Sequence, residues 1–200
     1  MSKHEILYIA IGVAVVVVLV ALALGLTASR RRETGLKRRF GSEYDRTVDD
    51  HGDRTAAEKE LRGRMERRRE LKIKALSPEA QGRYQLAWQK VQSDFVDEPS
   101  QAVRDADALV TRVMTDRGYP MTDFEQRAAD VSVDHGDVVA DYRGAHAISL
   151  RNEQGVASTE ELRQAMTHYR ALFLRLLDDG KPEVPIAARY AGTAAPSDPH

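Results

Sequence analysis

A run of 21 uncharged residues near the amino terminus limits what this chain can fold into more than any other feature. The run, ILYIAIGVAVVVVLVALALGL, spans residues 6–26, and its most polar members are one tyrosine and two glycines. As an α-helix it would be about 31 Å long, which matches a hydrocarbon core of about 30 Å. The sequence therefore predicts a transmembrane helix over residues 6–26, after a short leader over residues 1–5.

A cleaved signal peptide is the alternative interpretation of this run. Signal peptides have apolar regions of about 7–15 residues that follow a positively charged leader. Here the run is longer, and Lys3 of the leader MSKHE is offset by Glu5. Cleavage after Ala28 would also put Leu26 where a small side chain is required. We therefore expect a permanent anchor.

Basic residues crowd the carboxyl-terminal end of the run, whereas Lys3 alone precedes it. Because positive charge beside an anchor stays on the cytoplasmic side, the sequence predicts a single-pass cell-membrane protein with a cytoplasmic body. The same side chains are candidate contacts to anionic lipids, worth about 1 kcal/mol each near the surface. The alternative is that they only set the topology. These six residues are Arg30, Arg31, Arg32, Lys37, Arg38 and Arg39.

Charge divides the remaining chain into a basic neck and an acidic body. Residues 27–76 contain 16 basic and 10 acidic residues, whereas residues 77–177 contain 11 basic and 16 acidic residues. The chain has no cysteine, which excludes disulfides, thiol catalysis and thiolate metal sites. Only Phe40 and Tyr44 provide aromatic groups among the arginines of the neck, so no nucleic-acid partner is expected.

The neck, residues 27–76, carries partial helical signals. Apolar residues recur at steps of four from Leu36 to Val48, and the sequence from Thr55 to Glu58 fits a capping box. No heptad pattern persists, so a strong coiled coil is not supported. We expect a solvated helical spacer, in which the arginines at 67–69 form a solvated face.

The body, residues 77–177, shows five stretches with apolar residues at helical spacing and no stretch that alternates with a period of two. Each stretch follows a candidate helix-capping residue, namely Ser77, Ser100, Thr122, Asp134 and Ser158. The predicted fold is therefore all-α, with an N-terminal transmembrane helix, a charged helical neck and a compact acidic bundle of about five helices. Residues 178–200 contain four prolines and no periodicity, which predicts a disordered tail.

The densest polar stretch, residues 130–148, is the candidate for metal binding or catalysis. It contains His135 and His146, and His168 lies further along the chain. Asp137 and Asp141 have the four-residue spacing of a helical ligand pair, but no HExxH motif occurs. Helix caps and surface charge explain these residues more simply than a site does, so we predict no catalytic residue, metal or cofactor. Partly buried histidines are the expected state, and a proton-sensing pair is the alternative.

The single tryptophan, Trp88, lies on the apolar face of the first predicted body helix. We expect it in the core, with a role in lining a groove for a partner helix as the alternative.

Several blocks of the sequence, in order, resemble a family of mostly actinobacterial proteins that often carry one predicted N-terminal transmembrane helix. The resemblance covers about residues 36–177, and it implies no functional residue, because no activity is established for the family. The blocks are FGSEYDRTV, FVDEPSQAVRDADALVTRVMTDRGYP, DFEQRAADVSVDH and STEELRQAMTHYRALF.

Together these features predict a membrane-tethered helical interaction module, an adaptor or scaffold, rather than an enzyme. Its expected partners are membrane lipids and a protein that the sequence does not identify. Two alternatives stay open: a metal-binding or catalytic helical domain that uses residues 130–168, and a sensor of anionic lipid or of the cell envelope.

Overall fold

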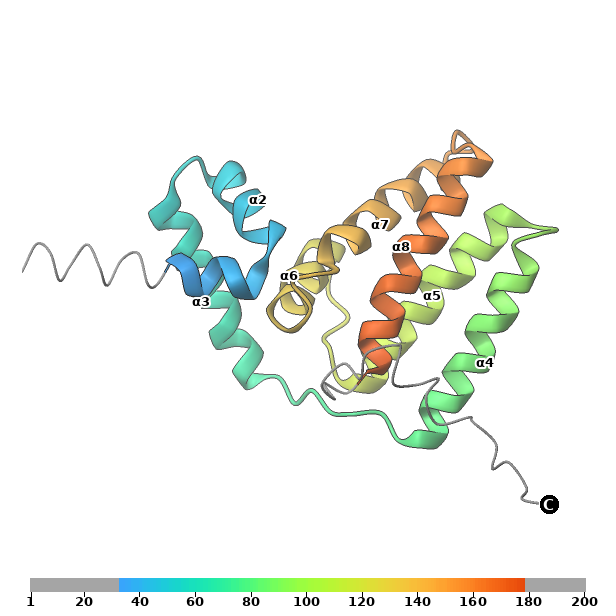
Figure 1. Cartoon of the computed structure of the whole chain (residues 1–200), viewed down its shortest axis with the longest axis horizontal. Helices are drawn as coiled ribbons and strands as arrows, with labels where there is room; N and C mark the ends of the chain where they lie inside the picture. The colour runs from blue at the N-terminus through green and yellow to red at the C-terminus, as the bar shows by residue number, and fades with distance from the viewer. Residues whose placement is uncertain (1–32, 179–200) are drawn as a thin grey trace, which may run out of the picture. The chain divides into compact units, whose positions relative to one another are not determined.

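The structure, a computed structural model, describes residues 33–178, and all regular secondary structure in this range is helical (Figure 1). The prediction of an all-α chain is confirmed over these residues. A helical segment at residues 33–40 is followed by α2 (Ser42–His51), α3 (Arg54–Glu70), α4 (Pro78–Asp94), α5 (Pro99–Arg117), α6 (Phe124–Asp134), α7 (Val139–Glu153) and α8 (Thr159–Leu177).

Three predictions fall outside the described residues: the transmembrane helix at 6–26, the basic triplet Arg30, Arg31 and Arg32, and the tail beyond Asp178. Between residues 33 and 178, no helix has both the length and the apolar composition needed to cross a bilayer.

The described chain forms two compact units that are interleaved in sequence. Unit 1 contains residues 33–70 and 124–140, and unit 2 contains residues 71–123 and 141–178. Helix α6 therefore belongs with α2 and α3, although it lies between α5 and α7 in the sequence. The expected bundle of about five helices is not matched, because unit 2 is built from α4, α5, α8 and most of α7.

Unit 1 has an apolar core of its own. Leu36, Phe40 and Tyr44 pack with Leu61 of α3 and Val133 of α6. The expected solvated spacer is thus wrong for these positions, since the stripe that begins at Leu36 is buried. The sequence showed the stripe but not the distant helix that covers it.

Two glycines allow α6 and the first helical segment to approach closely. A Cβ atom at Gly136 would lie 2.5 Å from the carbonyl oxygen of Arg39 and 2.9 Å from the Cα of Phe40. Gly41, which has a φ of 56°, breaks the helix between residues 40 and 42. The loop after α6 therefore packs directly against backbone, where no side chain fits.

Helix α3 begins at Arg54, two residues earlier than the predicted capping box implies. The backbone N–H of Ala56 donates to the carboxylate of Asp53 at 2.9 Å, so Asp53 rather than Thr55 caps the helix. Gly52, with a φ of 64°, ends α2 just before this cap.

In unit 2, α5 packs against both α4 and α8. Two predicted caps are confirmed: Ser77 accepts the N–H of Ala80 at 3.2 Å, and Ser158 forms a complete capping box with Glu161. The fully buried core side chains of this unit include Val103, Val110, Met114, Leu172 and Phe173.

Two other predicted caps are wrong. Helix α5 begins at Pro99, after Glu98 and not after Ser100, because proline suits the first turn of a helix. Asp134 is the last residue of α6 rather than the cap of α7, which begins at Val139.

Candidate functional site

The described half of the predicted basic cluster lies on the helical segment 33–40. Lys37, Arg38 and Arg39 are all exposed. Lys37 pairs with Glu33 at 3.2 Å. The side chain of Arg39 is fixed through its Nε atom, which donates to the carbonyl oxygen of Val133 at 3.1 Å. The cluster therefore presents positive charge to solvent while one of its members contacts α6.

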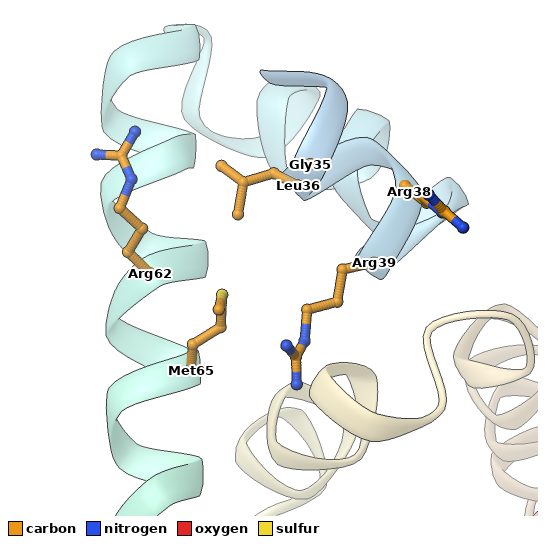
Figure 2. A pocket seen from close by; sticks show the side chains of 6 residues that line it. All are labelled: Gly35, Leu36, Arg38, Arg39, Arg62 and Met65. Atoms are coloured by element: carbon orange, nitrogen blue, oxygen red, sulfur yellow. The ribbon is translucent and has the colours of Figure 1, made fainter. Parts of the chain in front are cut away.

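A groove of about 600 Å³ opens between this segment and α3. Figure 2 shows Leu36 and Met65 pointing into it from the two helices, with Arg62 and Arg39 at its edges. Among residues 33–178, no atom would lie within 4 Å of a Cβ atom at Gly35, so the described part of the chain leaves the groove open there. The groove has an apolar floor and a basic rim, and its lining residues are Gly35, Leu36, Arg38, Arg39, Arg62 and Met65.

The sequence did not indicate that Arg62 and Met65 line a groove, although Met65 follows Leu61 on the same face of α3. Arg62 is held in place by Glu58, whose carboxylate accepts a hydrogen bond from its Nη2 at 2.7 Å. Such a pair is typical of a glutamate and an arginine four residues apart on a helix.

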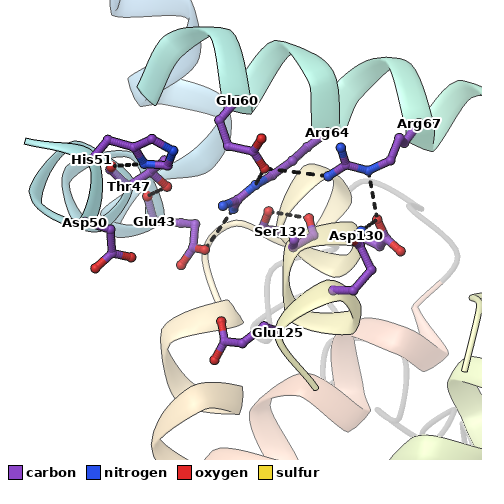
Figure 3. Close-up of polar contacts among 12 residues, drawn as sticks. Glu43, Thr47, Asp50, His51, Glu60, Arg64, Arg67, Glu125, Asp130 and Ser132 are labelled. Carbon is purple, nitrogen blue, oxygen red and sulfur yellow. Dashed lines mark hydrogen bonds and ion pairs between the residues drawn. The ribbon is translucent and has the colours of Figure 1, made fainter. Parts of the chain in front are cut away.

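A buried ion pair joins α2 to α3 (Figure 3). Arg64 donates through Nη1 to Oε1 of Glu43 at 2.9 Å, and through Nε to Oε1 of Glu60 at 3.0 Å. Glu43 is 2 % exposed and Arg64 is 8 % exposed. A signal for this pair exists in the sequence, because Glu43 and Arg64 each interrupt an apolar face at helical spacing.

Helix α6 meets α2 and α3 through charges as well as through Val133. Nε of Arg67 lies 4.0 Å from Oδ1 of Asp130, and Arg68 pairs with Asp134. Nη2 of Arg46 lies 3.9 Å from Oε2 of Glu125. The expected solvated face at residues 67–69 is therefore wrong for its first two arginines, which face the carboxylates of α6.

Two carboxylates in this network have pKa values that move in opposite directions. Burial raises the pKa of Asp130, against the hydrogen bond from Gln126 and the charge of Arg67. Burial would also raise the pKa of Glu60, but the hydrogen bond and charge of Arg64 outweigh it and leave that pKa lowered. The two pKa values differ because Glu60 accepts a hydrogen bond from the guanidinium of Arg64, whereas the guanidinium of Arg67 lies 4.0 Å from Asp130.

The histidines of the polar stretch do not form one cluster. His135 follows α6 in unit 1, whereas His146 and His168 belong to unit 2. Nδ1 of His168 lies 2.7 Å from Oδ1 of Asp141, which ties α8 to α7. Within residues 33–178, no group of three or more histidine and acidic side chains could hold a metal ion.

Trp88 is 5 % exposed and stacks on Phe173, with ring centroids 4.8 Å apart. It also lines a shallow hollow of about 220 Å³ together with Phe95, Met166 and Arg170. The core position is therefore confirmed, and one edge of the residue borders a surface depression.

A hydrogen bond that the sequence did not indicate lies in the same unit, where the hydroxyl of Tyr169 donates to Asp107 at 2.9 Å. Burial, followed by the charge of Asp107, raises the pKa of Tyr169. This hydroxyl therefore acts as a structural donor between α8 and α5.

No protein-family model, curated protein or solved structure matches this chain. The resemblance to the actinobacterial family stays a prediction, and the function has to be argued from the groove and the charges of unit 1.

Proposed function

We propose that the protein is a single-pass, membrane-tethered helical interaction module with a cytoplasmic body. The observation that carries the proposal is the surface of unit 1. Exposed Lys37, Arg38 and Arg39 and a groove with a basic rim follow closely after the apolar run at residues 6–26. Positive charge next to an anchor is retained on the cytoplasmic side, where it meets anionic lipids.

The short connection supports contact between unit 1 and the membrane surface. Only six residues separate the end of the apolar run from Glu33, and a chain of that length reaches at most about 25 Å. Since unit 1 has its own core and a buried ion pair, it would hold its basic face near the lipid headgroups as a folded body.

Unit 2 is the part that we propose to meet a protein partner. It exposes isolated apolar side chains such as Leu86 of α4 and Leu174 of α8, and its charges nearly balance, with 12 basic and 13 acidic residues over 71–123 and 141–178. The prolines beyond Asp178 suit a disordered tail, and the low aromatic content of the neck argues against a nucleic-acid partner.

The absence of cysteine gives a direct test of topology. A single cysteine is introduced by Ser93→Cys, at an exposed position of α4, and intact cells are treated with a membrane-impermeant maleimide. We expect labelling only after lysis. The matched control, Ser2→Cys in the leader, should react in intact cells. Labelling of the Ser93→Cys variant in intact cells would refute the cytoplasmic assignment.

A further inference from the structure

We propose that the groove between residues 33–40 and α3 binds one acidic phospholipid molecule. The phosphate would lie at the basic rim, which includes Arg39 and Arg62 at separate edges, and the adjoining part of an acyl chain would cover Leu36 and Met65. This inference rests on the proposed function, because it names the ligand of the membrane-facing surface of unit 1.

Charge selects an anionic occupant. Of the lining residues that the structure describes, three of six are arginines and none carries a carboxylate. The planar guanidinium presents several N–H donors at once, which suits the oxygens of a phosphate group. Glu58 already pairs with Arg62, whereas the hydrogen bond of Arg39 goes to a neutral carbonyl, so an anionic ligand would add to the charge compensation of this rim.

The arginines at the edges are held in position. Arg39 is fixed through its Nε atom to the carbonyl oxygen of Val133, and Arg62 through its Nη2 atom to Glu58. A guanidinium has five N–H donors, so one hydrogen bond orients the group and leaves most of its donor capacity for another acceptor. A ligand that binds to pre-positioned groups loses less entropy than one that has to order them.

The apolar floor of the groove favours a lipid over a soluble phosphate compound as the ligand. Leu36 and Met65 point into the groove from opposite helices, and they are the side chains that a hydrocarbon would cover (Figure 2). A volume of about 600 Å³ holds a headgroup phosphate with part of a chain and is too small for a whole phospholipid. The rest of the lipid would stay in the bilayer, which the short connection to residue 26 allows.

The test uses the full-length chain, purified in a mild non-ionic detergent with added phosphatidylglycerol or phosphatidylcholine. Native mass spectrometry then counts the lipid molecules that each chain retains. We expect one phosphatidylglycerol per chain and at least about tenfold weaker retention of phosphatidylcholine. Arg62→Gln and Met65→Gln should each reduce retention of phosphatidylglycerol several-fold, and Arg62→Lys should reduce it less.

Arg69→Gln is the matched control, because Arg69 is an exposed arginine of the same helix that does not line the groove. It should retain phosphatidylglycerol like the unchanged chain. An equal loss in Arg69→Gln would show diffuse charge attraction and overturn the inference, as would equal retention of the two lipids.

Competition with millimolar inorganic phosphate distinguishes a lipid headgroup from soluble phosphate as the ligand. If phosphate alone displaces the lipid, the groove is a site for soluble phosphate and the inference fails. Circular dichroism of each variant establishes that the helices are intact. Cysteine labelling is read independently, so a failed topology prediction is distinguishable from a failed lipid site.

Discussion

The carboxylate of Glu43 and the guanidinium of Arg64 are charged groups placed where apolar ones would be expected. Both lie on buried helix faces, at 2 % and 8 % exposure, and they satisfy each other at 2.9 Å. Removing charge from water costs several kcal/mol per ion, so each group depends on the other. The pair therefore favours one alignment of α2 on α3, since a shifted register would break this interhelical bond and leave Glu43 and Arg64 to partners within their own helices, such as Arg46 and Glu60.

We expect Arg64→Met to lower the free energy of unfolding by up to about 3–5 kcal/mol, because Glu43 would stay buried and lose its 2.9 Å bond, with the longer 3.7 Å contact to Arg46 retained. The double variant Glu43→Leu with Arg64→Met should recover most of this loss. Thermal unfolding of the full-length chain, followed by circular dichroism at 222 nm, measures both. A single variant as stable as the unchanged chain would contradict the burial of the pair.

Asp130 and Glu60 should give opposite pH dependences. Because burial raises the pKa of Asp130, its ionised form opposes folding at neutral pH, and that penalty disappears as the pH falls through the folded pKa towards the ordinary value of 3.8. Asp130→Asn should therefore raise the melting temperature at pH 7, with a gain that shrinks as the pH falls.

Glu60 has a lowered pKa, so its contribution is present above its ordinary value of 4.5 and is lost as the pH falls through the folded pKa. Glu60→Gln should lower the melting temperature at pH 7 and converge with the unchanged chain in acid. Melting curves at a series of pH values compare the two variants. A melting temperature that Asp130→Asn lowers at pH 7, by an amount that shrinks in acid, would show that the nearby arginines outweigh burial.

At the level of helices, local signals in the sequence predicted those features that depend on a few neighbouring residues. The caps at Ser77 and Ser158 form as expected because the hydroxyl meets an amide three residues later. The starts of α3 and α5 were predicted wrongly, because Asp53 caps α3 and Pro99 begins α5. Each stretch offered more than one suitable first residue, and the local sequence does not decide between them. The position of α6 could not be predicted, because it depends on the contact of Val133 with a core some 90 residues earlier.

The capping box of α8 should contribute about 1 kcal/mol. Ser158→Ala removes the acceptor for the N–H of Glu161 and is expected to lower the free energy of unfolding by about 0.5–2 kcal/mol. Thr159→Ala, at the exposed first residue of the helix, is the control and should change stability much less. Emission of Trp88, which stacks on α8, reports the transition.

Two glycine-to-alanine substitutions should change the stability of the protein in opposite directions. At Gly136 the added methyl group would lie 2.5 Å from the carbonyl oxygen of Arg39, and we expect a loss of about 1–3 kcal/mol as α6 is pushed away. At Gly63, within α3, the nearest atom is 3.8 Å away, and alanine should stabilise the helix by about 1 kcal/mol. Thermal melts measure both changes, and equal effects would refute the close backbone approach.

For the molecule as a whole, the sequence predicted an all-α chain and two regions of opposite charge. It did not predict that part of the acidic region folds with the basic one. Arg46, Arg67 and Arg68 face carboxylates of α6, so the two regions are matched through side chains that are far apart in sequence. The groove was also unpredictable, since Leu36 and Met65 meet only once α3 has folded back.

The ion pairs that join α6 to α2 and α3 should make the packing of α6 within unit 1 sensitive to salt. Raising the ionic strength from 0.1 M to 1 M shortens the Debye length from about 10 Å to about 3 Å, which weakens partly exposed pairs. Hydrogen exchange of the full-length chain should therefore become faster in the amides of α6, with little change in α5, whose buried side chains are mainly apolar. Unchanged exchange in α6 would show that Val133 and the backbone contacts hold the helix alone.

The interleaved order of unit 1 also has a consequence for how the protein is made. Residues 33–70 leave the ribosome well before residues 124–140, and at about 5–20 residues per second the interval is several seconds. Throughout that time Leu36, Phe40 and Leu61 lack the α6 residue Val133 that packs against them in the finished unit. If the apolar run has by then entered the bilayer, these apolar side chains stay exposed near the lipid until α6 is synthesised.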